Sequence, residues 1–133
     1  MILGIGTDLM DVSRMARELA GASGFREELF TAAEIAYCET CRHPARHYAA
    51  RFAAKEALVK ALGPEAPAGV AWREAEVDRD GPGGPRLRLH GRLREAAARL
   101  GVRNVFVSVS HTDALASATV VLEGAGAERG SGT

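Results

Sequence analysis

The chain has 133 residues, of which 47% are hydrophobic and 26% are charged, a composition typical of one folded domain. Seventeen basic residues balance seventeen acidic ones, so binding to nucleic acid or to an anionic membrane through net charge is not expected. No apolar run approaches the roughly 18–20 residues of a membrane span. The first residues, MILGIGTDLMDV, lack the basic start of a secretory signal, and the chain has only two cysteines. We therefore expect a cytoplasmic protein with reduced thiols.

The first half of the chain predicts one short strand followed by three helices. They are expected over residues 2–8, from 11 or 13 to 21, from 31 onward, and over about 45–62. Asp11 or Ser13 can cap the first helix, and Thr31 with Glu34 has the spacing of a capping box at the start of the second. Gly63-Pro64 ends the third helix, because proline cannot continue it.

After a stretch rich in proline and glycine, the hydrophobic pattern changes to the period of two that is typical of strands. Strands are predicted near 74–79 and 85–90, with a turn over 80–84, then a helix over 91–100 and a hairpin of strands over 105–111 and 116–123. This order of elements indicates an α+β fold. Residues 124–133 are rich in glycine and small polar residues, so we expect a loose tail after a single domain of residues 1–123.

Two carboxylates are candidates for chemistry. Asp8 closes an apolar strand, where it either caps a turn or ligates a metal. Glu56 lies at the margin of the buried stripe of the long helix, one turn from Phe52. A carboxylate there is costly unless a cation compensates it. Glu56 therefore either pairs with Lys60, four residues later, or takes a metal or catalytic role.

His111 ends a predicted strand between two hydroxyl residues, Ser110 and Thr112. It is either a surface or packing residue or, with its neighbours, part of a donor set for phosphate. Arginines also gather between positions 86 and 103, but aromatic residues are too few to interleave with them. Stacking on nucleic-acid bases is therefore weakly supported, and a solvated basic face is the alternative.

Four residues, Cys38, Cys41, His43 and His47, have the side-chain chemistry of a zinc site. Their spacing differs from that of a zinc finger, in which about a dozen residues separate the two ligand pairs. Zinc binding, a redox-active cysteine pair and purely structural thiols all stay open for this group.

Three blocks of sequence together resemble the bacterial holo-[acyl-carrier-protein] synthase family, the small 4′-phosphopantetheinyl transferases. The blocks are Ile2-Leu-Gly-Ile-Gly-Thr-Asp8-Leu, Arg51-Phe-Ala-Ala-Lys55-Glu56-Ala-Leu-Val-Lys60-Ala-Leu-Gly63 and Val107-Ser-Val-Ser110-His111-Thr112. Phe30-Thr-Ala-Ala-Glu34 fits the family's usual helix opening. The resemblance covers residues 1 to about 123, and the middle block is the specific one. It implies an antiparallel sheet packed with helices, in a homotrimer whose sites lie between neighbouring subunits.

The family resemblance also implies a reaction: transfer of the phosphopantetheine arm of coenzyme A to a serine of apo-acyl carrier protein, with release of adenosine 3′,5′-bisphosphate. Asp8 and Glu56 match the family's Mg²⁺ ligands. Lys60 matches the lysine near the pyrophosphate, and His111 matches a coenzyme A contact. Glu56, Lys60 and His111 are thus the implied catalytic residues.

The resemblance implies further contacts with both substrates. The positions expected to contact coenzyme A are Arg51, Lys60, Ser110, His111 and Thr112. Arg14 resembles a basic position that receives the acidic carrier protein. The resemblance gives no role to Asp113.

The chemistry of the residues leaves the general base open among Glu56, Glu34 and a metal-bound water. It also leaves open whether the carrier serves fatty-acid or polyketide synthesis. Two other functions compete with group transfer: hydrolysis of phosphodiester or pyrophosphate bonds, and a non-enzymatic binding module built on the arginines or on the Cys/His group.

Overall fold

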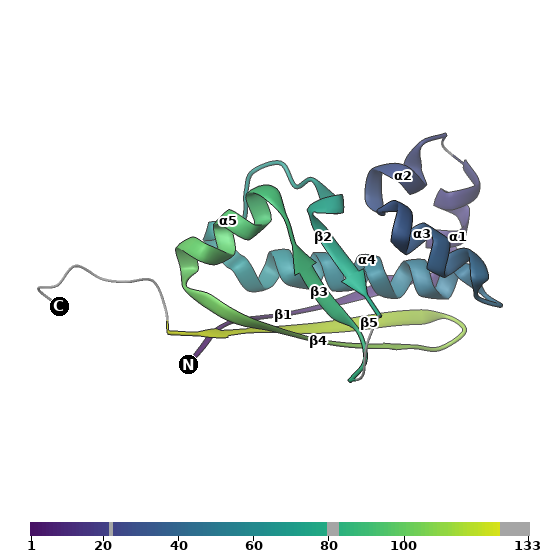
Figure 1. Ribbon diagram of the computed structural model, residues 1–133. Helices are drawn as coiled ribbons and strands as arrows, with labels where there is room; N and C mark the ends of the chain where they lie inside the picture. Colours follow the sequence, from purple (N-terminus) through teal and green to yellow (C-terminus); the bar gives the residue numbers. More distant parts are fainter. Residues whose placement is uncertain (22, 80–82, 126–133) are drawn as a thin grey trace, which may run out of the picture.

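The computed structural model describes residues 1–21, 23–79 and 83–125 (Figure 1). Its first half consists of strand β1 (Ile2–Asp11) and helices α1 (Val12–Gly21), α2 (Phe25–Leu29), α3 (Ala32–Thr40) and α4 (Pro44–Leu62). Short 3₁₀ turns, η1 (Gly63–Glu65) and η2 (Trp72–Glu74), precede strands β2 (Ala75–Asp78) and β3 (Arg86–Leu89). Helix α5 (Gly91–Leu100) and strands β4 (Val102–His111) and β5 (Leu115–Gly124) follow.

The predicted α+β class and most predicted elements are confirmed. Helix α2 was not predicted, and the predicted end of β1 at Asp8 lies three residues before its observed end at Asp11. The strand continues to Asp11 because it pairs with β5 as far as Leu115. Within the predicted turn over 80–84, residues 80–82 lie outside the described residues, and so do residues 126–133 of the predicted tail.

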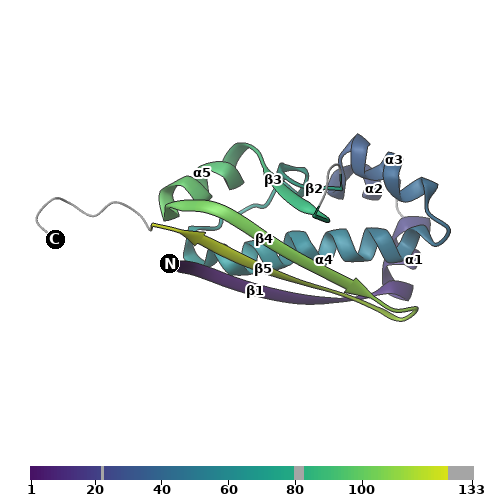
Figure 2. The ribbon, with the colours of Figure 1, turned by 60° about the horizontal axis from the view of Figure 1, so that its bottom comes forward.

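Three long strands form an antiparallel sheet in the order β1-β5-β4, and β2 and β3 form a separate antiparallel pair. Helix α4 runs along one face of the three-stranded sheet (Figure 2). The register places Asp8 of β1 opposite Ala118 of β5, and Ala118 opposite Val109 of β4. Asp8 and Val109 are therefore at the same level on the two outer strands.

The contact between β1 and α4 depends on two glycines. A Cβ atom at Gly4 would collide with the backbone carbonyl of Ala61, and one at Gly6 with that of Ala57. The strand therefore approaches the helix backbone directly. Because side chains two residues apart point to the same face of a strand, Asp8 follows Gly6 toward α4. The Gly-Ile-Gly-Thr-Asp segment thus places the Asp8 carboxylate beside α4.

The inner face of β5 and the middle of α4 supply much of the core. On β5, alternate residues from Ala116 to Leu122 are buried, and α4 buries small alanines such as Ala53 and Ala57. Small side chains on the helix allow it to lie close to the sheet. Among the described residues, no helix combines the length and apolarity that a membrane crossing requires.

Candidate active site

An acidic pair and a lysine meet where β1 crosses α4. Lys60 Nζ donates to Asp8 Oδ1 at 2.9 Å and to the carbonyl oxygen of Thr7 at 3.0 Å. Only 11% of the Asp8 side chain is exposed, whereas 56% of the Lys60 side chain is. Glu56 lies one helical turn before Lys60 and is half-buried, as its place in the helical pattern predicted. The structure therefore brings together the three residues that the first and middle blocks supplied.

The pKa of Glu56 reflects both its burial and the charges around it. Burial is the main cause that raises the pKa of its carboxyl above the usual 4.5, and the negative charge of Asp8 raises it further. Lys60 and Arg14 oppose this effect. Two carboxylates that disfavour each other's charge form a place where a cation is stabilised.

Arg14 is held near the acidic pair by the start of α1. The Asp11 carboxylate accepts hydrogen bonds from the backbone N–H groups of Ser13 at 3.0 Å and Arg14 at 3.4 Å, as a helix cap does. The hydroxyl of Ser13 also donates to this carboxylate and is the main cause that lowers the pKa of Asp11. Of the two predicted caps, Asp11 is confirmed. The exposed Arg14 side chain therefore extends from the first turn of α1, whose position the Asp11 cap fixes.

A second, basic group lies on the other side of α4. The ring of His111, at the end of β4, meets that of His47 on α4 edge to face, with centroids 5.1 Å apart. Both rings line a small pocket together with Arg51 and Arg79. Desolvation and the nearby charges of His111 and the arginines lower the pKa of His47 below 6.5, so this imidazole is neutral at neutral pH.

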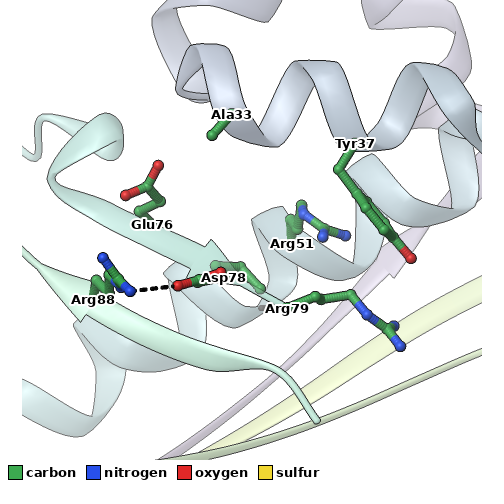
Figure 3. A pocket seen from close by; sticks show the side chains of 8 residues that line it. Ala33, Tyr37, Arg51, Glu76, Asp78, Arg79 and Arg88 are labelled. Carbon is green, nitrogen blue, oxygen red and sulfur yellow. Dashed lines mark ion pairs between the residues drawn. The ribbon is translucent and has the colours of Figure 1, made fainter. Parts of the chain in front are cut away.

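Arg51 extends this basic group into a neighbouring pocket of about 180 Å³ between α3, α4 and the β2-β3 pair (Figure 3). Its guanidinium carbon lies 4.4 Å from the centre of the Tyr37 ring, and that of Arg79 lies 5.6 Å from the same ring. Arg51 is only 4% exposed, yet its Nε has no hydrogen-bond partner among the residues that the structure describes. A buried donor without an acceptor is costly and favours an anionic ligand.

The hydroxyls next to His111 have different surroundings. Ser110 lies on the face of β4 that points away from α4 and is exposed. Thr112 accepts hydrogen bonds from the backbone N–H groups of Ala114 and Leu115 at 3.2 and 3.1 Å, so it stabilises the hairpin turn. Asp113 pairs with Arg46 at 2.9 Å. Ser110, Thr112 and Asp113 therefore do not form one donor set with His111.

The two groups are separated by α4 itself. Asp8 approaches the helix from the strand at one edge of the sheet, and His111 ends the strand at the other edge. With a rise of about 1.5 Å per residue, His47 and Lys60 are about 20 Å apart along the helix axis. The candidate residues thus form two half-sites on opposite flanks of one helix.

The model of the 4′-phosphopantetheinyl transferase superfamily matches residues 4–119. The chain belongs to this superfamily. The holo-[acyl-carrier-protein] synthase of Anaeromyxobacter dehalogenans strain 2CP-C is 48% identical over 130 residues, which are 95% of this chain and 99% of that protein. That of Clavibacter michiganensis is 47% identical over 124 residues, 93% and 98% of the two chains. These relatives place the chain in the holo-[acyl-carrier-protein] synthase family, so it is a phosphopantetheinyl transferase enzyme.

Solved structures of the family have the same fold. The synthase of Neisseria meningitidis superposes with a TM-score of 0.81 at 31% identity, covering 92% of this chain and 99% of that one. The synthase of Bacillus anthracis, solved in complex with CoA (3′,5′-ADP), superposes with a TM-score of 0.74 at 30% identity, covering 96% and 99%. The predicted phosphopantetheinyl transferase-like fold is confirmed.

In this phosphopantetheinyl transferase, one residue of the middle block has a role that its pattern did not predict. Lys55 is fully buried, and its ammonium pairs with Glu34 at 2.7 Å. Both Glu34 oxygens are occupied, since they also accept from the backbone N–H groups of Thr31 and Val77. Glu34 therefore cannot serve as the general base that the sequence left open. The capping-box spacing of Thr31 and Glu34 was the sequence signal for the local role of Glu34 at the start of α3.

The Cys/His group does not form a metal site within the described residues, where no cluster of three or more potential ligands was found. Cys38 is buried in α3, and both cysteines are free thiols. The arginines between 86 and 103 are all exposed to solvent, as the plainer interpretation expected, but those that line pockets line different ones. Arg88 pairs with Asp78 at 2.9 Å and Arg99 with Glu65 at 3.1 Å, so part of their charge is balanced.

Proposed function

We propose that the chain transfers the 4′-phosphopantetheine group of coenzyme A to a serine of apo-acyl carrier protein, with Mg²⁺, and releases adenosine 3′,5′-bisphosphate. The observation that carries this proposal is the convergence of Asp8 and Glu56 where β1 meets α4. The names of the relatives reported above and the coenzyme A complex of a family member support the same substrates. We also propose the cytoplasm as the location, where free thiols such as Cys38 and Cys41 persist.

The residues fit a hard divalent cation. Asp8 and Glu56 offer oxygen ligands only, and Mg²⁺ is commonly held by one or two carboxylates, with phosphate oxygens and water completing its shell. The charge of Asp8 raises the pKa of Glu56, and a cation between the two carboxylates would offset this repulsion. When bound, Mg²⁺ would withdraw negative charge from the pyrophosphate and stabilise the leaving group.

The chain's own residues then position the substrates. Lys60, exposed beside the acidic pair, supplies a positive charge for the pyrophosphate. Arg51 offers a phosphate group its Nε, which none of the described residues pairs, and His111 adds a ring nitrogen at the adjoining pocket. The proton of the carrier serine passes to Glu56 or to a solvent molecule, because Glu34 is fully buried. Ser110 and Thr112 remain proposed coenzyme A contacts through their exposed positions.

We further propose that the active enzyme is a homotrimer with each site shared by two subunits. The acidic and basic groups lie on opposite flanks of α4, so one subunit's acidic group can meet a neighbour's basic group without crossing the helix. The sheet face opposite α4 also exposes a row of apolar side chains, Ile5 and Phe106 at 66% and 55%, on either side of Val121. Such a row is suited to an interface between copies.

The carrier protein is proposed to dock near Arg14. This arginine is exposed at the start of α1 and acts on Glu56, so a partner that contacts it arrives beside the acidic pair. A strongly acidic carrier would be attracted to this position at long range.

The decisive experiment measures the intact mass of an apo-acyl carrier protein incubated with the chain, coenzyme A and Mg²⁺. We expect a gain of about 340 Da, the mass of the phosphopantetheine group. EDTA and the Glu56→Gln variant should each abolish the gain, while circular dichroism shows an intact fold. Full activity of Glu56→Gln would remove this residue from the site. Release of adenosine bisphosphate without a carrier protein would favour the hydrolytic alternative.

A further inference from the structure

We propose that Lys60 is an exchangeable counter-ion of Asp8, which occupies this carboxylate when no metal is bound and leaves it when a divalent cation binds. The inference rests on the proposed function, because it concerns the same acidic pair. It adds a coupling between metal binding and phosphate binding, which a simple contact between Lys60 and the pyrophosphate would not produce. Metal binding would release the ammonium that the substrate needs.

The geometry of Asp8 supports the first half of this exchange. The Asp8 carboxylate is almost buried, and the Lys60 ammonium contacts its Oδ1 at 2.9 Å. The carbonyl oxygen of Thr7 accepts a second hydrogen bond from the same ammonium, so Lys60 is bound to β1 at two points. A nearly buried carboxylate needs such a partner, above all with Glu56 nearby.

The position of Lys60 supports the second half. More than half of its side chain is exposed, and its ammonium ends a flexible four-carbon stem. It can therefore turn away from β1 without disturbing the core. A divalent cation on the oxygens of Asp8 would repel an ammonium that sits on Oδ1. The displaced Lys60 ammonium remains close to the acidic pair, where an anionic phosphate can bind it.

This exchange couples the two ligands. A cation that displaces Lys60 prepares the site for a phosphate, and a phosphate that attracts Lys60 away from Asp8 prepares it for a cation. Because coupling between two ligands is reciprocal, each should tighten the binding of the other. A lysine that only contacted phosphate would not respond to the metal alone.

The chain carries lysine at positions 55 and 60 alone, which makes a direct test feasible. The full chain is labelled with ¹³C,¹⁵N-lysine, and the two side-chain signals are followed by NMR during titration with Mg²⁺ in the absence of coenzyme A. We expect the Lys60 signal to move to the position of a solvated lysine, while the buried Lys55 signal stays in place. In Asp8→Asn, the Lys60 signal should begin at the solvated position and not respond.

A second measurement follows the affinity for Mn²⁺, detected by electron paramagnetic resonance, without coenzyme A. Removing the competing charge in Lys60→Met should tighten Mn²⁺ binding about three- to tenfold. Added adenosine 3′,5′-bisphosphate should tighten it further in the wild type but much less in Lys60→Met. Arg99→Met, which removes an exposed charge paired with Glu65, serves as the matched control and should leave the affinity unchanged.

The outcomes separate this inference from the proposed function. If Mn²⁺ and Mg²⁺ bind while the Lys60 signal stays unchanged, the exchange is wrong and the metal site stands. If neither cation binds to the wild type and Glu56→Gln behaves identically, the metal site fails, and the exchange fails with it.

Discussion

Glu34 and Lys55 form an ion pair of 2.7 Å in which both side chains are fully buried. The Lys55 ammonium also donates to the backbone carbonyls of Leu29 at 2.7 Å and Trp72 at 3.2 Å. One side chain of α4 thereby joins the end of α2, the start of α3 and the η2 turn. Because Glu56 is the next residue on α4, this network also fixes the rotation that turns Glu56 toward β1.

Removing one partner of this pair should be strongly destabilising. Lys55→Met leaves the Glu34 carboxylate buried without its cation, and we expect a loss of about 3–5 kcal/mol in the free energy of unfolding. Urea denaturation measures this loss. The double variant Glu34→Leu/Lys55→Met should recover much of it, because no charge is then buried alone. A loss below about 1 kcal/mol for the single variant would show that solvent compensates the pair.

Gly6→Ala should displace β1 from α4. The added Cβ meets the backbone carbonyl of Ala57, which cannot move aside as a flexible side chain would. We expect a loss of stability of about 1–3 kcal/mol and a larger loss of transfer activity, since Asp8 moves with the strand. Gly21→Ala is the matched control, because a Cβ there meets no atom of the described part of the chain within 4 Å. Thermal unfolding and the mass assay should therefore separate the two alanine variants.

The two cysteines should differ in reactivity. Burial raises the pKa of the Cys38 thiol to about 12, so only about one in 10⁴ is thiolate at pH 8. Iodoacetamide should label Cys41 alone in the native protein and both cysteines in urea, as peptide mass spectrometry can establish. Rapid native labelling of Cys38 would contradict its burial.

The Cys38 thiol also makes the free energy of unfolding depend on pH. The folded pKa of Cys38 lies above the value of 9.0 for an unperturbed thiol, so the unfolded chain loses its proton first. The contribution of Cys38 is therefore complete below pH 9 and declines between pH 9 and about 12. Cys38→Ala should remove this part of the decline in urea denaturation measured over that range. An unchanged slope would assign the decline to other groups.

Mixing two inactive variants tests whether the site is shared between subunits. Asp8→Asn disables the acidic group and His111→Ala the basic group, and each variant alone should lose most transfer activity. If a site takes one group from each of two subunits, random mixing of equal amounts restores roughly a quarter of the sites. Activity after unfolding and refolding the two variants together measures this recovery. If the mixture recovers no activity while the wild-type protein, refolded in the same way, recovers fully, the result would favour sites within single subunits.

Local signals in the sequence determined much of the framework. The spacing of Thr31 and Glu34 predicted a capping box, and the structure contains both of its hydrogen bonds. Gly63-Pro64 marked the end of α4, and the change of hydrophobic period marked the later strands. Such features depend on residues within one turn or one strand, so the sequence suffices to predict them. The motif blocks likewise identified Asp8 and Glu56 as a candidate pair.

Only the tertiary structure decided which distant side chains meet. Lys60 was open to pairing with Glu56 on its own helix, but the packing of β1 gives it Asp8 instead. Lys55 had no role predicted from the sequence, and it is a buried partner of Glu34. These pairings follow from the register of a sheet and the rotation of α4, which are set by the sum of many small packing contacts. No single stretch of sequence contains that sum, because each contact joins residues that are far apart along the chain.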